Sequence, residues 1–175
     1  LQIDFRCIAP QTDESPRPEE APDALAQRLA IAKASETATR HPGSVVIGSD
    51  QVASVDGHVL GKPGGFEPAV KQLRACSARE VQFFTAVSLV CLHADHKRVH
   101  VEPFSVVFRE LNEAEIANYL HRDRPYDCAG SFKVESLGIA LFERLAGNDP
   151  TSLEGLPLIA LTSLLREIGV DALAG

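Results

Sequence analysis

A set of charged and polar side chains in this sequence could together support chemistry on a phosphate anhydride. These residues are Glu14, Lys33, Asp50, Gln51, Lys62, Lys133 and Glu135. Proteins bind Mg²⁺ through one or two carboxylates together with phosphate oxygens and waters, so Glu14 and Asp50 would suffice to hold a divalent cation. The lysines could neutralise a polyphosphate, and a carboxylate beside the metal could deprotonate an attacking water. Each of these charges taken singly is also typical of a solvated surface.

Asp50 lies in the most informative segment, the run from residue 45 to residue 52. The β-branched residues at positions 45–47 favour a buried strand, and Gly48 would let another backbone or a ligand come close. We expect Asp50 at the C-terminal end of this strand, where ligands of open α/β sheets bind. A turn residue that caps the next element remains the alternative, and the local pattern alone favours it.

The composition excludes several classes of protein. The chain has 175 residues, enough for one domain, with 45% hydrophobic and 23% charged residues, as in ordinary globular proteins. Its net charge of -7 argues against a nucleic-acid polymer or an anionic membrane as partner. The four cysteines are scattered at positions 7, 76, 91 and 128, which favours neither zinc nor disulfides. With no long apolar span or secretory signal in the sequence, we expect a cytoplasmic protein.

The elements that must position these side chains alternate between strands and helices. We expect strands at residues 3–7, 45–52, 58–60, 81–92, 98–108 and 139–142, and helices at 23–39, 67–76, 112–121 and from 155–157 to about 169. Asp23 and Asn112 are the predicted helix caps, and Asp56-Gly57 predicts a hairpin turn. The acidic, proline-rich stretch 9–22 and residues 61–65 are predicted loops. This order favours an α/β protein with a mixed twisted sheet and flanking helices.

Several ordered motifs carry a family resemblance over nearly the whole chain. They are Asp13-Glu14, Arg28-Leu29-Ala30 with Lys33-Ala34, Gly48-Ser49-Asp50-Gln51-Val52, Gly61-Lys62-Pro63, the stretch from Tyr126 to Glu135, and Gly155-Leu156-Pro157-Leu158. With these motifs the chain resembles the Maf family of nucleoside triphosphate pyrophosphatases. The Gly-Ser-Asp-Gln and Cys-Ala-Gly-Ser-Phe-Lys-x-Glu versions resemble the branch that hydrolyses 7-methyl-GTP. The dTTP/UTP branch usually has Thr after the Asp.

The resemblance implies a cytoplasmic, often homodimeric enzyme with two lobes around a cleft, which uses Mg²⁺ or Mn²⁺ to cut a nucleotide between its α and β phosphates. It implies Asp50 as the proton acceptor, Glu14 and Asp50 at the metal, and Lys33 and Lys62 at the phosphates. Gln51 and Glu135 match positions tied to base selection, and Lys133 belongs to the same substrate-binding set. A dTTP or UTP pyrophosphatase and a non-catalytic nucleotide-binding regulator of septum formation are the alternatives.

The chemistry of the base explains how Glu135 could select 7-methylguanine. A 7-methylated guanine carries positive charge on its ring and presents hydrogen-bond donors at N1 and N2. We expect Glu135 to be a buried carboxylate that accepts these hydrogen bonds and offsets the charge. Thymine or uracil would leave such a carboxylate unpaired, which can discriminate by roughly 10⁴-fold.

One feature departs from the family pattern. The family opens with a strand and a Ser-x-Ser-Pro-x-Arg type loop whose Arg contacts phosphate, and no such segment precedes Leu1 in this sequence. We therefore expect a single Maf-like domain over residues 1–175 without that strand and loop. The expectation is that the chain releases little pyrophosphate until such a segment is restored.

Overall fold

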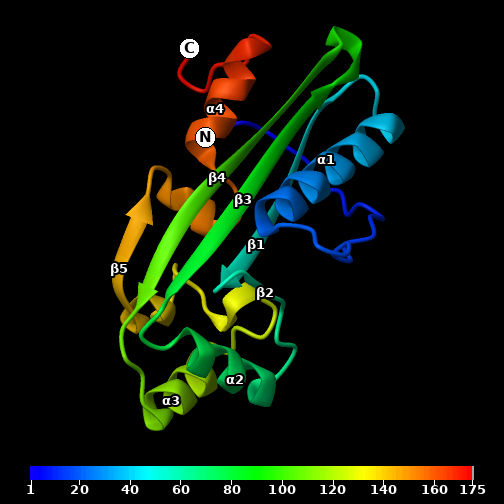
Figure 1. Ribbon diagram of the computed structural model, residues 1–175. Helices are drawn as coiled ribbons and strands as arrows, with labels where there is room; N and C mark the ends of the chain where they lie inside the picture. Colours follow the sequence, from blue (N-terminus) through cyan, green and yellow to red (C-terminus); the bar gives the residue numbers. More distant parts are fainter. Residues whose placement is uncertain (175) are drawn as a thin grey trace.

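A five-stranded sheet is the centre of the fold in the computed structural model, which describes residues 1–174 (Figure 1). The strands lie in the order β2-β1-β3-β4-β5. They are β1 (Val45–Val55), β2 (His58–Leu60), β3 (Glu80–Cys91), β4 (His96–Phe108) and β5 (Phe142–Gly147). The α-helices are α1 (Pro22–Arg40), α2 (Phe66–Cys76), α3 (Glu113–Asp123) and α4 (Leu158–Glu167). Short 3₁₀ helices are η1 (Leu92–Ala94), η2 (Ala129–Ser131), η3 (Leu137–Leu141) and η4 (Pro150–Glu154).

Every strand pairing among residues 1–174 is antiparallel, which corrects the expected mixed sheet. The cause is the path between β1 and β3. The chain leaves β1 at Val55, returns along its edge as the short β2, forms α2 beyond that end of the sheet, and re-enters as β3, with Val55 opposite Val81 (Figure 1). A parallel pair would need a connection that crosses the face of the sheet. The α/β class with helices flanking a sheet is confirmed.

The two faces of the sheet are covered by different helices. On one face, Leu25 and Leu29 of α1 pack with Val52 of β1. On the other face, Leu161 and Leu165 of α4 belong to an apolar cluster with the β3 residues Val87, Leu89 and Cys91. Successive side chains of a strand point to opposite faces, so neighbouring residues of β1 meet α1 and the α4 side in turn.

A cluster of phenylalanine rings joins the sheet to the segment that follows α3. The ring of Phe132 lies edge-on to Phe83 at a centroid distance of 5.3 Å, to Phe108 at 5.6 Å and to Phe142 at 4.8 Å. Edge-to-face pairs of this kind stabilise beyond the area that they bury. Phe132 therefore fixes the segment around it against β3, β4 and β5.

Locally determined elements agree with the sequence predictions. Asp56 and Gly57 adopt φ values of 49° and 79°, as a tight hairpin turn requires, and connect β1 to β2. Asn112 caps α3 by accepting from the Glu115 amide, while the Glu115 side chain accepts from the Asn112 amide. None of the helices in residues 1–174 is long and apolar enough to cross a bilayer.

Three local predictions were wrong. The predicted strand at residues 3–7 is irregular, with Phe5 82% exposed, because none of these residues pairs with a strand of the described sheet. The cap of α1 is Ala21, without a side-chain bond, and Pro22 starts the helix, so Asp23 lies in its first turn. Residues 139–141 belong to η3, and the strand begins only at Phe142.

Candidate active site

The structure brings all the predicted site residues together in one cleft of about 650 Å³. The cleft lies along the outer edge of β1. In the described part of the chain, β2 pairs only with residues 53–55 of that edge. The predicted residues that line the cleft are Glu14, Lys33, Asp50, Gln51, Lys62, Lys133 and Glu135.

Asp50 lies in the middle of β1, opposite Ala86 of β3. The sequence had indicated the strand end or a turn, but the strand continues to Val55 before the hairpin turns. The Asp50 carboxylate therefore projects from the middle of a paired strand, on the face covered by α1. A position inside a strand holds a side chain more rigidly than a loop would.

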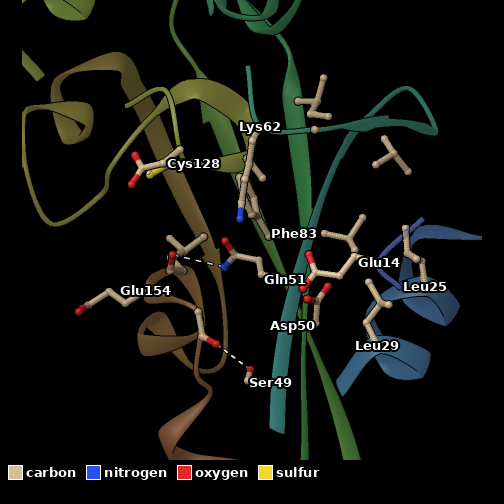
Figure 2. A pocket seen from close by; sticks show the side chains of 18 of the residues that line it. Glu14, Leu25, Leu29, Ser49, Asp50, Gln51, Lys62, Phe83, Cys128 and Glu154 are labelled. Atoms are coloured by element: carbon tan, nitrogen blue, oxygen red, sulfur yellow. Dashed lines mark hydrogen bonds between the residues drawn. The ribbon is translucent and has the colours of Figure 1, made fainter. Parts of the chain in front are cut away.

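Lys33 of α1 joins the two predicted metal ligands. Its Nζ lies 2.6 Å from Asp50 Oδ1 and 2.6 Å from Glu14 Oε1. The Asp50 and Lys33 side chains are only 12% and 17% exposed, whereas that of Glu14 is 53% exposed. The carboxylate oxygens of two distant segments thus converge on one cation (Figure 2 shows Glu14 beside Asp50).

Gly48 permits this contact between α1 and β1. A Cβ atom at position 48 would lie 2.6 Å from the Ala30 carbonyl oxygen and 2.6 Å from the Ala34 amide nitrogen. These are backbone atoms of α1, so only glycine allows the helix to pack this closely. The prediction that Gly48 admits a close backbone is confirmed.

Arg28 secures the loop that carries Glu14. Its guanidinium donates to both Glu20 carboxylate oxygens at 2.6 and 2.8 Å, and to the Ser15 carbonyl oxygen at 3.0 Å. Hydrogen bonds from Arg28 and from the Arg17 amide lower the pKa of Glu20 to about 2. The loop is thus tied to α1 next to Glu14 by a bidentate ion pair.

Burial and charge act on Asp50 and Lys33 together. Burial raises the pKa of Asp50 above its ordinary value, although Lys33 opposes the shift. Burial alone would lower the pKa of Lys33, but hydrogen bonds from Lys33 to Asp50 and Glu14 raise it. Lys33 is therefore cationic at neutral pH, and Asp50 is a better proton acceptor than a solvated aspartate.

Gln51 points to the opposite face of β1, where its hydrogen-bond partners are uncharged. Its Nε2 donates to the carbonyl oxygen of Ser152 at 2.7 Å and to Thr85 Oγ1 at 3.1 Å. The neighbouring Ser49 donates to the Gly155 carbonyl oxygen at 2.7 Å. In Figure 2 these two side chains reach the turn around η4 by the dashed bonds. β1 thus presents the charged Asp50 to α1 and the uncharged Gln51 to η4.

The remaining cleft residues come from loops. Lys62 is exposed in the loop after β2 and extends into the cleft (Figure 2). The Nζ atom of Lys133 lies 3.6 Å from Oδ1 of Asp127. Glu135 lines the cleft but is exposed, which corrects the expected buried carboxylate. It lies in the turn at residues 134–136 rather than in a strand, and its side chain is exposed.

The comparisons with known proteins agree with this geometry. Residues 1–168 match the family described as Maf-like protein. The chain belongs to the Maf family. It is 51% identical over 179 residues to a protein of Bordetella pertussis named 7-methyl-GTP pyrophosphatase, with 100% of this chain and 87% of that protein covered. A Colwellia psychrerythraea protein of the same name is 47% identical over 174 residues, with 99% and 87% covered.

The carboxylates of this Maf protein fit a divalent cation. No group of three or more His, Cys, Asp and Glu side chains within residues 1–174 is arranged to hold a metal. Glu14 and Asp50 nevertheless converge on one point, as their 2.6 Å distances to the same ammonium show. Mg²⁺ or Mn²⁺ needs no third protein ligand where phosphate oxygens and waters complete its shell.

Sequence reasoning missed the residues that support Gln51 in this Maf protein. Thr85 faces it from β3, and η4 lies about a hundred residues further along the chain, which no local pattern could reveal. One signal was present, however. Asp149 precedes Pro150 and Thr151, and Asp149 Oδ1 accepts from the Thr151 amide at 3.0 Å, as an Asp in such a turn is expected to do.

Proposed function

We propose that this Maf protein hydrolyses 7-methyl-GTP between the α and β phosphates and releases 7-methyl-GMP and pyrophosphate. The observation that carries the proposal is the convergence of Asp50, Glu14 and Lys33 in a cleft that Gln51 and Glu135 also line. The names of the relatives support the choice of nucleotide.

In the proposed mechanism, Asp50 accepts a proton from the attacking water at a carboxylate oxygen, and Glu14 and Asp50 would hold the cation. A bound Mg²⁺ or Mn²⁺ would neutralise phosphate charge and polarise the water. Lys33 would exchange its carboxylate partners for phosphate oxygens, and Lys62 would contact the same polyphosphate from the opposite loop. Both lysines stabilise the negative charge that spreads over the phosphate oxygens during the reaction.

The acidic lining supports a cationic base over thymine or uracil. Asp127, Glu135 and Glu154 all line the cleft, on the side away from α1. A methylated guanine ring offers both positive charge and donor groups to such carboxylates. Because Glu135 is exposed, its contribution in the free protein is screened by water, and a bound base that displaces this water would strengthen it.

A panel of nucleotides tests the proposal. Pyrophosphate release is measured with 7-methyl-GTP, GTP, dTTP, UTP and ATP, each with Mg²⁺, with Mn²⁺ and with a chelator. We expect 7-methyl-GTP to have the highest kcat/KM and the chelator to abolish release. Faster release from dTTP or UTP would favour that branch of the family. Binding without release, with an effect that survives Asp50→Asn, would favour the regulator.

Three further expectations stay predictions. A homodimer is tested by light scattering, and cytoplasmic location by fractionation of the cells that make the protein. The effect of an added N-terminal strand and Ser-x-Ser-Pro-x-Arg loop is tested by repeating the nucleotide panel on the extended chain.

A further inference from the structure

The amide nitrogen of Gln51 is committed to the protein. Nε2 lies 2.7 Å from the Ser152 carbonyl oxygen, 3.3 Å from the Leu153 carbonyl oxygen and 3.1 Å from Thr85 Oγ1. An amide nitrogen has two hydrogens to donate, so these acceptors leave it nothing to offer a ligand.

These partners also fix which way the amide faces. Backbone carbonyl oxygens only accept hydrogen bonds, so the end of Gln51 that meets Ser152 and Leu153 must be the nitrogen. The reverse orientation would place three carbonyl oxygens against one another. Figure 2 shows the result: the nitrogen is turned to the η4 side, and the amide oxygen is directed toward the side of the cleft where Lys62 lies.

Thr85 is central to this arrangement. It is completely buried, and its hydroxyl donates to the Ser152 carbonyl oxygen at 2.9 Å while it accepts from Gln51. One hydroxyl hydrogen can serve only one acceptor, so the direction of both bonds is determined. Thr85 thus binds both the Gln51 amide and the Ser152 carbonyl group that accepts from this amide.

Asp149 holds the turn that supplies the carbonyl groups. It is 1% exposed, its Oδ1 accepts from the Thr151 amide at 3.0 Å, and its Oδ2 accepts from the Ile159 amide at 2.7 Å. Ser152 Oγ also donates to the Asp149 carbonyl oxygen at 2.6 Å. The buried carboxylate therefore fixes η4 to the first turn of α4.

We propose that Thr85, with the η4 turn that Asp149 holds, positions Gln51 as an acceptor-only reader of the donor edge of the substrate base. The inference deepens the proposed function and rests on it. Guanine presents N1–H and a 2-amino group, both donors, whereas adenine presents an acceptor at N1 and no amino group at C2. Gln51 Oε1 accepts from the adjacent N1–H and 2-amino donors of guanine, whereas it repels N1 of adenine, whose one donor on this edge is the 6-amino group.

Substitutions at Thr85 test the positioning role. The readout is the edge ratio, defined as kcat/KM for GTP divided by kcat/KM for ATP, because these two substrates share a neutral ring and differ at that edge. We expect Thr85→Val to lower the edge ratio about fivefold, the typical effect of one hydrogen bond, and Thr85→Ser to restore it to within about twofold. Ser88→Ala removes another buried hydroxyl from β3 and leaves the ratio unchanged. Thr85→Ala serves if the valine variant does not fold.

A double-mutant cycle separates positioning from general destabilisation. Gln51→Leu removes the reader, and we expect it to lower the edge ratio at least tenfold. Thr85→Val in the Gln51→Leu background then has no further effect on the ratio, because the hydroxyl acts only through Gln51. An edge ratio that Thr85→Val leaves unchanged, or lowers equally in both backgrounds, overturns the proposal.

A binding experiment keeps this test independent of turnover. The dissociation constants of GMP and AMP are measured by calorimetry on the wild type and the same variants. If no nucleotide is hydrolysed but the GMP preference falls in Thr85→Val, the proposed reaction fails and the positioning role stands. If 7-methyl-GTP is hydrolysed and the GMP preference is the same in every variant, the reaction stands and the positioning role fails.

Discussion

The two faces of β1 treat adjacent residues in opposite ways. Asp50 meets α1 and forms an ion pair with Lys33 at 2.6 Å, next to a second carboxylate from Glu14. Gln51 meets η4 and forms only neutral hydrogen bonds, with Ser152 among its acceptors. The pleat of a single strand thus places an ion-paired carboxylate and a neutral amide on opposite faces of β1, one residue apart.

This difference suggests a division of labour along the cleft. Charged groups at low exposure interact strongly with a polyphosphate, and their positions depend on how closely α1 approaches β1. Neutral groups with fixed directions distinguish donors from acceptors, and their positions depend on η4. The two properties should therefore be separable by substitution.

Asp50→Asn gives the largest expected effect. It keeps the shape of the side chain but removes the proton acceptor, so we expect kcat for 7-methyl-GTP to fall by about 10²–10⁴. The edge ratio should change little. Asp95→Asn, which makes the same change at an exposed residue outside the cleft, is the control and should cost less than about fivefold. Steady-state pyrophosphate release measures both, and a wild-type kcat in Asp50→Asn would remove Asp50 from the mechanism.

Gly48→Ala is expected to disturb only the charged face. The added methyl group would meet backbone atoms of α1 at 2.6 Å, so the helix must move away from β1 and carry Lys33 with it. We expect a loss of about 1–3 kcal/mol in the free energy of unfolding, measured by urea denaturation, and a lower kcat at an unchanged edge ratio. Gly43→Ala is the control, because nothing lies within 4 Å of its added Cβ. Equal stability of the two variants would contradict the close packing.

Glu135→Gln should lower the preference for the methylated base more than it lowers catalysis. The carboxylate offsets the ring charge but is exposed, so we expect the ratio of kcat/KM for 7-methyl-GTP over GTP to fall about three- to tenfold. Glu143→Gln changes an exposed glutamate of β5 that does not line the cleft, and serves as control. If the ratio of 7-methyl-GTP to GTP turnover stays the same in Glu135→Gln, the carboxylate does not read the charge.

The smallest effect concerns Cys128, which lies on the side of the cleft away from α1 (Figure 2). Burial, followed by the charge of Asp127, raises the pKa of its thiol to about 11. The raised pKa means that about a thousandth of Cys128 is thiolate at pH 8, so alkylation is slow and accelerates tenfold per pH unit up to about pH 11. We expect 7-methylguanosine to slow the alkylation of Cys128 several-fold at pH 9, whereas pyrophosphate should not slow it. Peptide mass spectrometry measures the alkylated fraction. If 7-methylguanosine and pyrophosphate protect Cys128 equally, the base and the phosphates bind on the same side of the cleft.

Local chain chemistry accounts for what the sequence predicted well. The Asp56-Gly57 turn and the Asn112 capping box depend on residues within four positions of each other, so their patterns are sufficient. The residues that line the cleft were also named in advance, because their motifs match the family. Their roles stay predictions.

The features that the sequence did not predict depend on contacts between distant parts of the chain. Period-two alternation predicted a strand at residues 3–7, but a strand also needs a partner, and the pattern carries no information about one. The antiparallel order follows from α2 lying beyond the end of the sheet, which composition does not encode. The acceptors of Gln51 lie in η4, whose distance along the chain exceeds any local window.

The phenylalanine cluster has a consequence for the order in which this protein folds. Phe83, Phe108 and Phe142 converge on Phe132 from up to 49 residues away along the chain, and these contacts fix the segment that bears Lys133 and Glu135. Loops of that length close late and at an entropic cost. We therefore expect the wall of the cleft that carries these two residues to assemble only after β3, β4 and β5 have met, and the Lys33–Asp50 pair to form before the complete pocket.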